Sequence, residues 1–448
     1  MRLPVSQPGD IFVAMMQVQM ELGETMKSYR IGFPGQLEAS VKSAKNALIV
    51  YELQQTVDGQ LLSEAVNKAM KLHPLFQSRL VRKAGLYCFE ETSAEAVVKE
   101  VPWGQHVSYG TEEFHGLPWV ITYSESTIVF TALHSLCDGM GMNAFMRTVF
   151  RYYFEAKGVV FHDDEGLLTP EDTRRTVVDP FRETGIKKAK TDIHEEDVKA
   201  HPIPDAFYSP VSLEDSVALF VIERADVSER GAETDTSIFA VLSALACRAF
   251  AEAAELEDGY VTANVAVDLR STYGSITDQD FSVAPQLRYD VAKLKNRDLS
   301  LQATVLRSQL DLYLDRENLD HQISVSNMTN GPLCRLILPV AKKAYMQMLF
   351  GKQASLVYSH MTKTGFSKTI ENQLKCVFLS GRNSGTPLTL FHGVTFRDNI
   401  YLNLQESSDG QKIVAAYAKL LDEQGIRYEL HRLPSPGFYQ YRGKPYFG

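Results

Sequence analysis

The segment DDEGLLTPEDTRRTVVDPFRETGIKKAKTDIHEEDVKAHPIPD, residues 163–205, most constrains how this chain folds. It is charged, contains several prolines and shows weak periodicity, whereas the sequence on either side has clear strand and helix patterns. Because 448 residues exceed what one hydrophobic core usually serves, we interpret the segment as a crossover between two domains. A long surface excursion within one domain is the alternative.

Both halves of the chain mix strands and helices. In the first half, ALIVYEL predicts a strand, Leu61 to Leu72 a helix that Pro74 stops, and FQSRLVRK with LYCFEE a hairpin. In the second half, SVALFVIE and YVTANVAVDLR predict strands, SIFAVLSALACRAFAEAAELE a buried helix, and PLTLFHGVTF with IYLNLQ a second hairpin. We therefore expect an α/β fold with a first subdomain at 1–165, a linker at 166–210 and a second subdomain at 211–448.

Composition and charge exclude several classes of protein. A net charge of -9 and a pI near 5.7 argue against a nucleic-acid partner or bulk attraction to an anionic membrane. The chain has no apolar stretch of membrane-spanning length and no basic leader, so we expect a cytoplasmic protein without integral membrane association. The five cysteines are scattered without a CxxC pair, which predicts free thiols and no zinc ribbon.

The stretch STIVFTALHSLCDGMGMNAFMRTVF, residues 126–150, is the strongest candidate for a functional site. Gly139-Met140-Gly141 formally begins a G-x-G-x-x-A pattern, but a dinucleotide cradle places its first glycine directly after the strand, and here His134 to Asp138 intervene. No P-loop and no G-x-S-x-G sequence is present. His134 and Asp138 are too few ligands for a metal, so no metal site is predicted.

Two interpretations of His134 remain open from the residues alone. TIVFTAL predicts a buried strand that carries His134 at its end, where an imidazole can face a cleft and take a proton from an attacking alcohol or amine. Alternatively, the histidine is structural, and Asp138 caps the helix that follows.

The sequence His134-Ser-Leu-Cys-Asp138-Gly139 resembles the H-x-x-x-D-G motif of the chloramphenicol-acetyltransferase-like acyltransferases. This superfamily includes condensation domains, plant-type BAHD transferases, wax ester synthases and alcohol acetyltransferases. The segments VYELQQTVDGQLLSEAVNKAMKLHPLFQSRLVRKAGLYCFEE, NVAVDLRSTYG and FSVAPQLRYD also occur in the family's order, so the resemblance covers roughly residues 25 to 430. It implies an α+β sandwich built as a pseudo-dimer of two acetyltransferase-like subdomains, with His134 in a central tunnel.

The resemblance also implies an activity. His134 would act as general base while an acyl group moves from a thioester, either acyl-CoA or an acyl-carrier protein, to an alcohol or amine. Acyl-CoA or a phosphopantetheine-linked thioester would be a co-substrate, and no cofactor would be bound permanently. We expect a monomer. The alternative is a non-catalytic acyl-binding or interaction protein that kept the fold.

The remaining site residues follow from the same resemblance. Asp138 and Gly139 would be structural, with Arg270 of VDLR as the partner of the Asp138 carboxylate; a simple helix cap with Arg270 in solvent is the alternative. The segment SHMTKTGF replaces a family S-N-x-G element and offers three hydroxyls for the tetrahedral oxyanion: Ser359, Thr362 and Thr364. A surface-loop role for this segment is the alternative.

Charge bias suggests where the donor docks. Between Arg335 and Lys375 the chain carries seven basic residues against the single acid Glu371. An anionic donor, whether coenzyme A or an acidic carrier protein, would be steered to such a patch. Its candidate contacts are Lys342, Lys343 and Lys363. The alternative is a solvated helix face.

Overall fold

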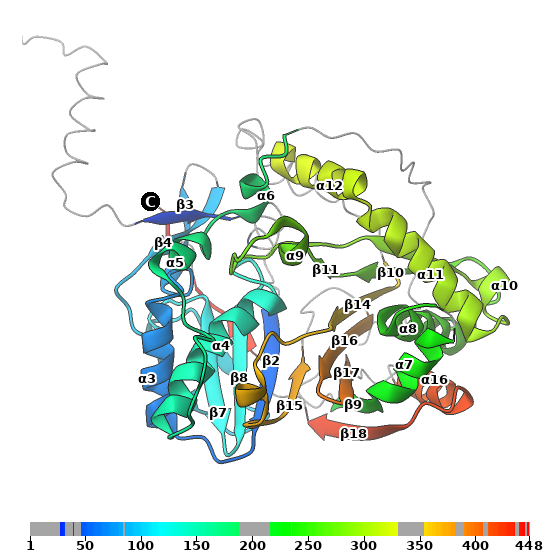
Figure 1. Cartoon of the computed structure of the whole chain (residues 1–448), viewed down its shortest axis with the longest axis horizontal. Helices are drawn as coiled ribbons and strands as arrows, with labels where there is room; N and C mark the ends of the chain where they lie inside the picture. The colour runs from blue at the N-terminus through cyan, green and yellow to red at the C-terminus, as the bar shows by residue number, and fades with distance from the viewer. Residues whose placement is uncertain are drawn as a thin grey trace, which may run out of the picture.

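Two lobes, each built around a β-sheet, lie side by side in this protein (Figure 1). A computed structural model describes residues 27–31, 39, 46–83, 86–187, 216–233, 235–329, 354–380, 389–405, 411–434, 439–443 and 446–447. Within these residues, the first lobe has a five-stranded sheet and the second a seven-stranded sheet. The α/β class predicted from the sequence is confirmed.

The five-stranded sheet has the order β15-β2-β8-β7-β5. Its strands are β2 (Asn46–Leu53), β5 (Val98–Glu100), β7 (Trp119–Ser124), β8 (Thr127–Leu133) and β15 (Leu374–Leu379). Helices α3 (Gly59–Met70) and α4 (Gly139–Ala156) pack with it. Phe130 of β8 meets both Trp119 and Phe145 with ring centroids 5.8 Å apart, so the strand that precedes His134 is anchored in an aromatic core.

The seven-stranded sheet has the order β13-β10-β14-β16-β17-β9-β18. Its strands are β9 (Ser216–Glu223), β10 (Tyr260–Val265), β13 (Gln286–Asp290), β14 (Leu356–Met361), β16 (Thr389–Phe396), β17 (Asn399–Gln405) and β18 (Tyr428–Pro434). Helices α7 (Arg224–Ala232), α8 (Ile238–Ala253), α11 (Leu299–Leu314) and α16 (Gln411–Glu423) contribute to the second core. Apolar residues such as Phe220, Phe391 and Leu402 face these helices, which leaves the other face of the sheet turned away from this core.

Shorter elements connect and border the two lobes. The strands are β1 (Ser28–Arg30), β3 (Ser78–Lys83), β4 (Leu86–Glu91), β6 (Val107–Tyr109), β11 (Val267–Asp268), β12 (Ser282–Val283), β19 (Tyr439–Tyr441) and β20 (Tyr446–Phe447). The helices are a 3-10 turn (Glu112–Phe114), α5 (Pro170–Arg175), α6 (Pro180–Glu183), α9 (Arg270–Tyr273), α10 (Val291–Leu294), α12 (Arg316–Thr329) and α15 (Lys368–Glu371).

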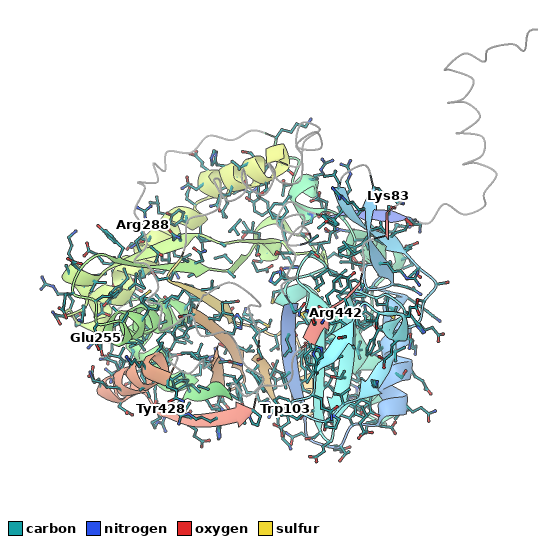
Figure 2. The ribbon with its side chains drawn as sticks, turned by 180° about the vertical axis from the view of Figure 1, so that it is seen from behind. Lys83, Trp103, Glu255, Arg288, Tyr428 and Arg442 are labelled. Atoms are coloured by element: carbon teal, nitrogen blue, oxygen red, sulfur yellow. The ribbon has the colours of Figure 1, made fainter. Side chains whose placement is uncertain are left out.

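Segments from the second half of the chain complete the first lobe. Strand β15 pairs antiparallel with β2, β19 pairs parallel with β6, and β20 pairs parallel with β3. Figure 2 shows Arg442 among the strands of the first lobe, where its amide donates to the Tyr109 carbonyl at 2.8 Å. Trp103, also labelled there, donates through Nε1 to the Pro434 carbonyl at the end of β18. The lobes are therefore interlocked.

Local predictions from the sequence hold with small shifts in their ends. The strand ALIVYEL is β2, and the predicted helix is α3, which begins two residues earlier because the Asp58 carboxylate accepts from the Gln60 and Leu61 amides. Strands β3 and β4 pair antiparallel, as do β16 and β17, so both hairpins are confirmed. Residues 188–210 of the predicted linker lie outside the described residues, and the subdomain boundaries stay a prediction.

Candidate active site

His134 lies in a tight turn between the end of β8 and the start of α4. The turn is held by hydrogen bonds from the Leu133 amide to the Pro118 carbonyl and from the Leu136 amide to the Leu133 carbonyl, at 2.9 and 2.8 Å. The His134 side chain is 32% exposed, yet its Nδ1 atom is buried. The exposed surface of the side chain therefore lies on atoms other than Nδ1.

Two glycines at the start of α4 let other elements approach closely. A Cβ at Gly141 would lie 2.0 Å from the Asp278 carbonyl oxygen, and one at Gly139 would lie 3.0 Å from Cε of Met361. Gly141, the second glycine of the G-x-G pattern, therefore leaves room for the backbone of Asp278 in the same chain.

Asp138 both caps α4 and pairs with Arg270. Its Oδ1 accepts from the Gly141 amide at 2.8 Å and its Oδ2 from the Phe281 amide at 3.2 Å, while the guanidinium donates one 2.8 Å bond to each oxygen. Burial alone would raise the Asp138 pKa, but the charge and hydrogen bonds of Arg270, with those two amides, hold it below its ordinary value.

Arg270 uses every N–H of its guanidinium. Besides the two bonds to Asp138, it donates to the Asp268 carboxylate and to the backbone carbonyls of Thr277 and Gln279. Because five donors meet five acceptors, the pair is geometrically fixed and links α4 of the first lobe to the 268–281 region.

The residues from Ser275 to Phe281 are docked between the lobes. The Asp278 amide donates to the Thr176 carbonyl at 2.7 Å, and the Thr277 hydroxyl donates to the Val178 carbonyl at 2.8 Å. The Asp278 carboxylate pairs with His73 across 2.8 Å, with both side chains fully buried. Contacts with several other parts of the chain thus fix the position of this segment.

Asp280 belongs to this segment and faces His134. Its Oδ2 lies 3.9 Å from His134 Nδ1, and its own side chain is 8% exposed. Its Oδ1 accepts from the Ser282 amide at 3.1 Å and the Ser282 hydroxyl at 2.6 Å, which fixes the orientation of the carboxylate.

His392 of β16 approaches the site from the second lobe. Burial, together with the nearby His134 imidazole, lowers the pKa of His392 to about 4, so its ring is neutral at physiological pH. His392 is in register with Ser359 of β14 and Asn403 of β17, so these three side chains share one face of the sheet. That face is the one turned away from the helices of the second lobe.

The predicted oxyanion candidates occupy different environments. Ser359 is half-buried beside His392, Thr362 is exposed, and the Thr364 side chain is buried. The Thr364 carbonyl accepts from Asn143 of α4 at 3.1 Å, so this part of the segment packs against the first lobe. Of the three hydroxyls, Ser359 shares the sheet face of His392.

Of the three predicted donor-docking residues, one lies among the described residues. Lys363 is exposed on the segment after β14. Lys342 and Lys343 lie outside the described residues, so the basic patch as a whole stays a prediction. Among the described residues, no group of three or more His, Cys, Asp or Glu is arranged to hold a metal ion. None of the helices in that part of the chain is both long and apolar enough to cross a membrane.

Several residues of this site were not identified from the sequence. Asp280, His392 and the His73–Asp278 pair carry no recognisable local motif, because distant parts of the chain bring them to the site. His392 had one weak signal: it interrupts the apolar pattern of β16 with a titratable side chain.

Comparison with known proteins identifies the fold. No protein-family model matches the chain, and no curated protein matches its sequence. Solved structures that match in three dimensions include TRI101 of F. sporotrichioides in complex with coenzyme A and T-2. Its TM-score is 0.61 at 14% identity, over 90% of this chain and 99% of that chain.

Two further structures agree. The trichothecene 15-O-acetyltransferase TRI3 from Fusarium sporotrichioides matches with a TM-score of 0.58 at 12% identity, covering 88% of this chain and 94% of that chain. The condensation domain of the monacolin K polyketide synthase MokA matches with a TM-score of 0.54 at 12% identity, covering 89% and 97%. The chain therefore has the chloramphenicol-acetyltransferase-like fold predicted from its motifs.

Proposed function

We propose that this protein is an acyltransferase that moves an acyl group from a thioester to a small alcohol or amine, with His134 as general base. The observation that carries the proposal is the placement of His134 on this fold. The ring is partly exposed at the end of a rigid strand, beside a helix start that the Asp138–Arg270 pair fixes.

In the proposed step, Nε2 of neutral His134 takes the proton of the acceptor hydroxyl or amine. The acceptor oxygen or nitrogen forms a bond to the thioester carbonyl carbon, and the carbon–sulfur bond then breaks as the tetrahedral intermediate collapses. The imidazolium returns its proton to the departing thiolate. No covalent acyl-enzyme is required, and His134 ends the cycle neutral.

The thioester carbonyl gains negative charge in this step and requires a hydrogen-bond donor. Ser359 and neutral His392 share one face of the sheet, His392 is near enough to His134 to feel its charge, and either side chain can donate one hydrogen bond. We propose Ser359 as the first candidate, since a hydroxyl rotates freely to meet a developing oxyanion. Thr362 and Thr364 remain weaker candidates.

We propose acyl-CoA as the donor to test first, because TRI101 was solved in complex with coenzyme A. The similarity to a condensation domain keeps a carrier-bound thioester as the second donor to test. Lys363 is a proposed docking contact for either anionic donor. Lys363→Glu is expected to raise the KM for the thioester and leave saturation by the acceptor unchanged. An unaltered KM and salt response would remove Lys363 from the donor entrance.

The function is tested by incubating the purified full chain with acetyl-CoA and a panel of alcohols and amines while free thiol is measured. Acylated product, identified by mass spectrometry, decides between an alcohol and an amine acceptor. His134→Ala should lower turnover by at least about 100-fold with an unchanged unfolding transition. Turnover in His134→Ala equal to that of the wild type would exclude the base role. Thioester binding without turnover in the wild type would favour the non-catalytic alternative.

A further inference from the structure

The acid nearest to His134 is contributed by a segment far along the chain. Asp280 lies between β11 and β12, and its Oδ2 is 3.9 Å from His134 Nδ1. This is an ion-pair distance rather than a hydrogen bond, and such contacts in unliganded sites often shorten when substrate binds. The carboxylate therefore faces the buried Nδ1 edge of the imidazole.

Asp280 is held so that one oxygen remains directed at the imidazole. Ser282 donates both its amide and its hydroxyl to Oδ1, at 3.1 and 2.6 Å. With Oδ1 fixed and the side chain almost fully buried, rotation of the carboxylate is restricted. The short side chain of Asp280 therefore holds Oδ2 toward His134 in one orientation.

The segment that carries Asp280 is itself fixed to both lobes. Arg270 donates to the carbonyls of Thr277 and Gln279, and Asp278 is paired with His73 of the first lobe. In Figure 1, α9 and β11, which lie just before this segment, are seen above α4 and between the lobes. The His134–Asp280 contact therefore depends on correct docking of the two halves.

Three other titratable groups near His134, among the residues that the structure describes, are either already paired or neutral. The negative charge of Asp138 is shared with Arg270 through two hydrogen bonds. Burial, with the nearby Asp138 carboxylate, raises the pKa of the Cys137 thiol well above its ordinary value, and His392 is neutral. Asp280 is thus the carboxylate placed to stabilise an imidazolium.

We propose that Asp280 is a positioning residue for His134, holding Nδ1 protonated and directed away from the substrates so that Nε2 is the nitrogen that exchanges the proton. The proposal rests on the acyltransferase function above. When Nε2 accepts the acceptor proton, the carboxylate stabilises the new positive charge and stays ionised itself. The proton then leaves from Nε2 to the thiolate, so Asp280 neither gains nor loses one.

The test compares Asp280→Asn with Ser282→Ala and with Asp290→Asn as a matched control. Asp290 caps α10 near the surface and lies in the same half of the chain, so Asp290→Asn removes a carboxylate without touching the site. Asp280→Asn should lower kcat on the order of tenfold with little change in KM, and Ser282→Ala should lower it less. The acid limb of the kcat/KM profile should move to lower pH, because the imidazolium has lost its counter-charge.

A second readout does not depend on turnover. Diethyl pyrocarbonate modifies neutral imidazoles. Mass spectrometry of the peptide that contains His134 gives the modification rate of this residue separately from those of the other histidines. At about pH 5.5, His134 in Asp280→Asn should react on the order of threefold to tenfold faster than in wild type. An unchanged modification rate at every pH overturns the proposal, whatever the kinetics show. If the wild type transfers no acyl group, the proposed function fails, and the modification rates alone decide the role of Asp280.

Discussion

His73 and Asp278, 205 residues apart in the sequence, form a fully buried hydrogen-bonded pair with Nδ1 2.8 Å from Oδ2. The other ring nitrogen of His73 lies 2.9 Å from the Thr148 hydroxyl of α4. The imidazole therefore joins the turn after α3, the middle of α4 and the segment that carries Asp280. Its burial makes this pair a structural contact behind the site, since neither group is accessible to a substrate.

Removing the carboxylate of this pair should destabilise the whole protein. Asp278→Asn leaves a buried imidazole nitrogen without its carboxylate partner, so we expect the free energy of unfolding to fall by about 3 kcal/mol. Urea unfolding followed by circular dichroism measures the change. Asp226→Asn is the matched control, because Asp226 pairs with Arg427 at the same 2.8 Å but on the surface, where the loss should be much smaller. Equal losses in both variants would contradict the role assigned to burial.

The two glycines at the start of α4 should respond differently to alanine. At Gly141 a Cβ meets the Asp278 carbonyl oxygen at 2.0 Å, and a backbone atom cannot move aside cheaply. Although alanine favours a helix by about 1 kcal/mol over glycine, the clash should dominate and cost about 3 kcal/mol.

Gly139→Ala provides the comparison. Its Cβ would meet the flexible end of Met361 at 3.0 Å and make an ordinary contact with Leu379 at 3.8 Å, so the stability should change by less than about 1 kcal/mol. Thermal unfolding of both variants under one set of conditions tests the pair. A Gly141→Ala protein as stable as wild type would show that the 275–281 segment is not rigidly docked on α4.

The parts of the fold that the sequence predicts are those with local causes. TIVFTAL alternates side chains between two buried faces and so predicts β8, and Asp138 is a good N-cap residue directly before a helical pattern. The contact between Asp138 and Arg270 came from the resemblance, since nothing in the spacing of two residues in different halves indicates that they meet. The structure places them 2.8 Å apart.

The site residues that could not be predicted from the sequence are brought together by the topology of the fold. Asp280 reaches His134 because Gly141 lets the Asp278 backbone approach and because Arg270 holds the neighbouring carbonyls. His392 reaches it because β16 places one strand face toward the first lobe. Likewise, the pairing of β15 with β2 exchanges a strand between halves, and no local pattern in LKCVFL specifies the sheet that it joins.

The hydroxyl that stabilises the oxyanion can be identified by kinetics. Ser359→Ala should lower kcat on the order of 100-fold with KM nearly unchanged, because the proposed hydrogen bond strengthens only in the transition state. Ser308→Ala on α11 is the control, since that hydroxyl is exposed and donates only within its own helix. A loss confined to Thr362→Ala would transfer the role to Thr362, and normal rates in Ser359→Ala would exclude Ser359.

The neutral histidines of the second sheet should make stability depend on pH. Burial lowers the pKa of His360 to about 4, and burial with the nearby His134 lowers that of His392 to about 4, whereas an unfolded imidazole titrates near about 6.5. Between these values the unfolded chain binds more protons than the folded one. The stability is therefore fully present above the unfolded value and is lost as the pH falls toward the folded value.

Replacing both rings removes this dependence. In the double variant His360→Asn/His392→Asn, the free energy of unfolding should fall less steeply between about pH 6.5 and 4 than in wild type, by at most about 1.4 kcal/mol per pH unit for each imidazole. His431→Asn serves as the control, because this ring on β18 is exposed and its Nε2 lies 3.1 Å from the carboxylate of Glu429, which is exposed as well. Urea unfolding at several pH values gives the slopes. Parallel slopes for wild type and the double variant would mean that these rings take up protons in the folded protein as readily as in the unfolded chain. The assignment of a neutral His392 beside His134 would then be wrong.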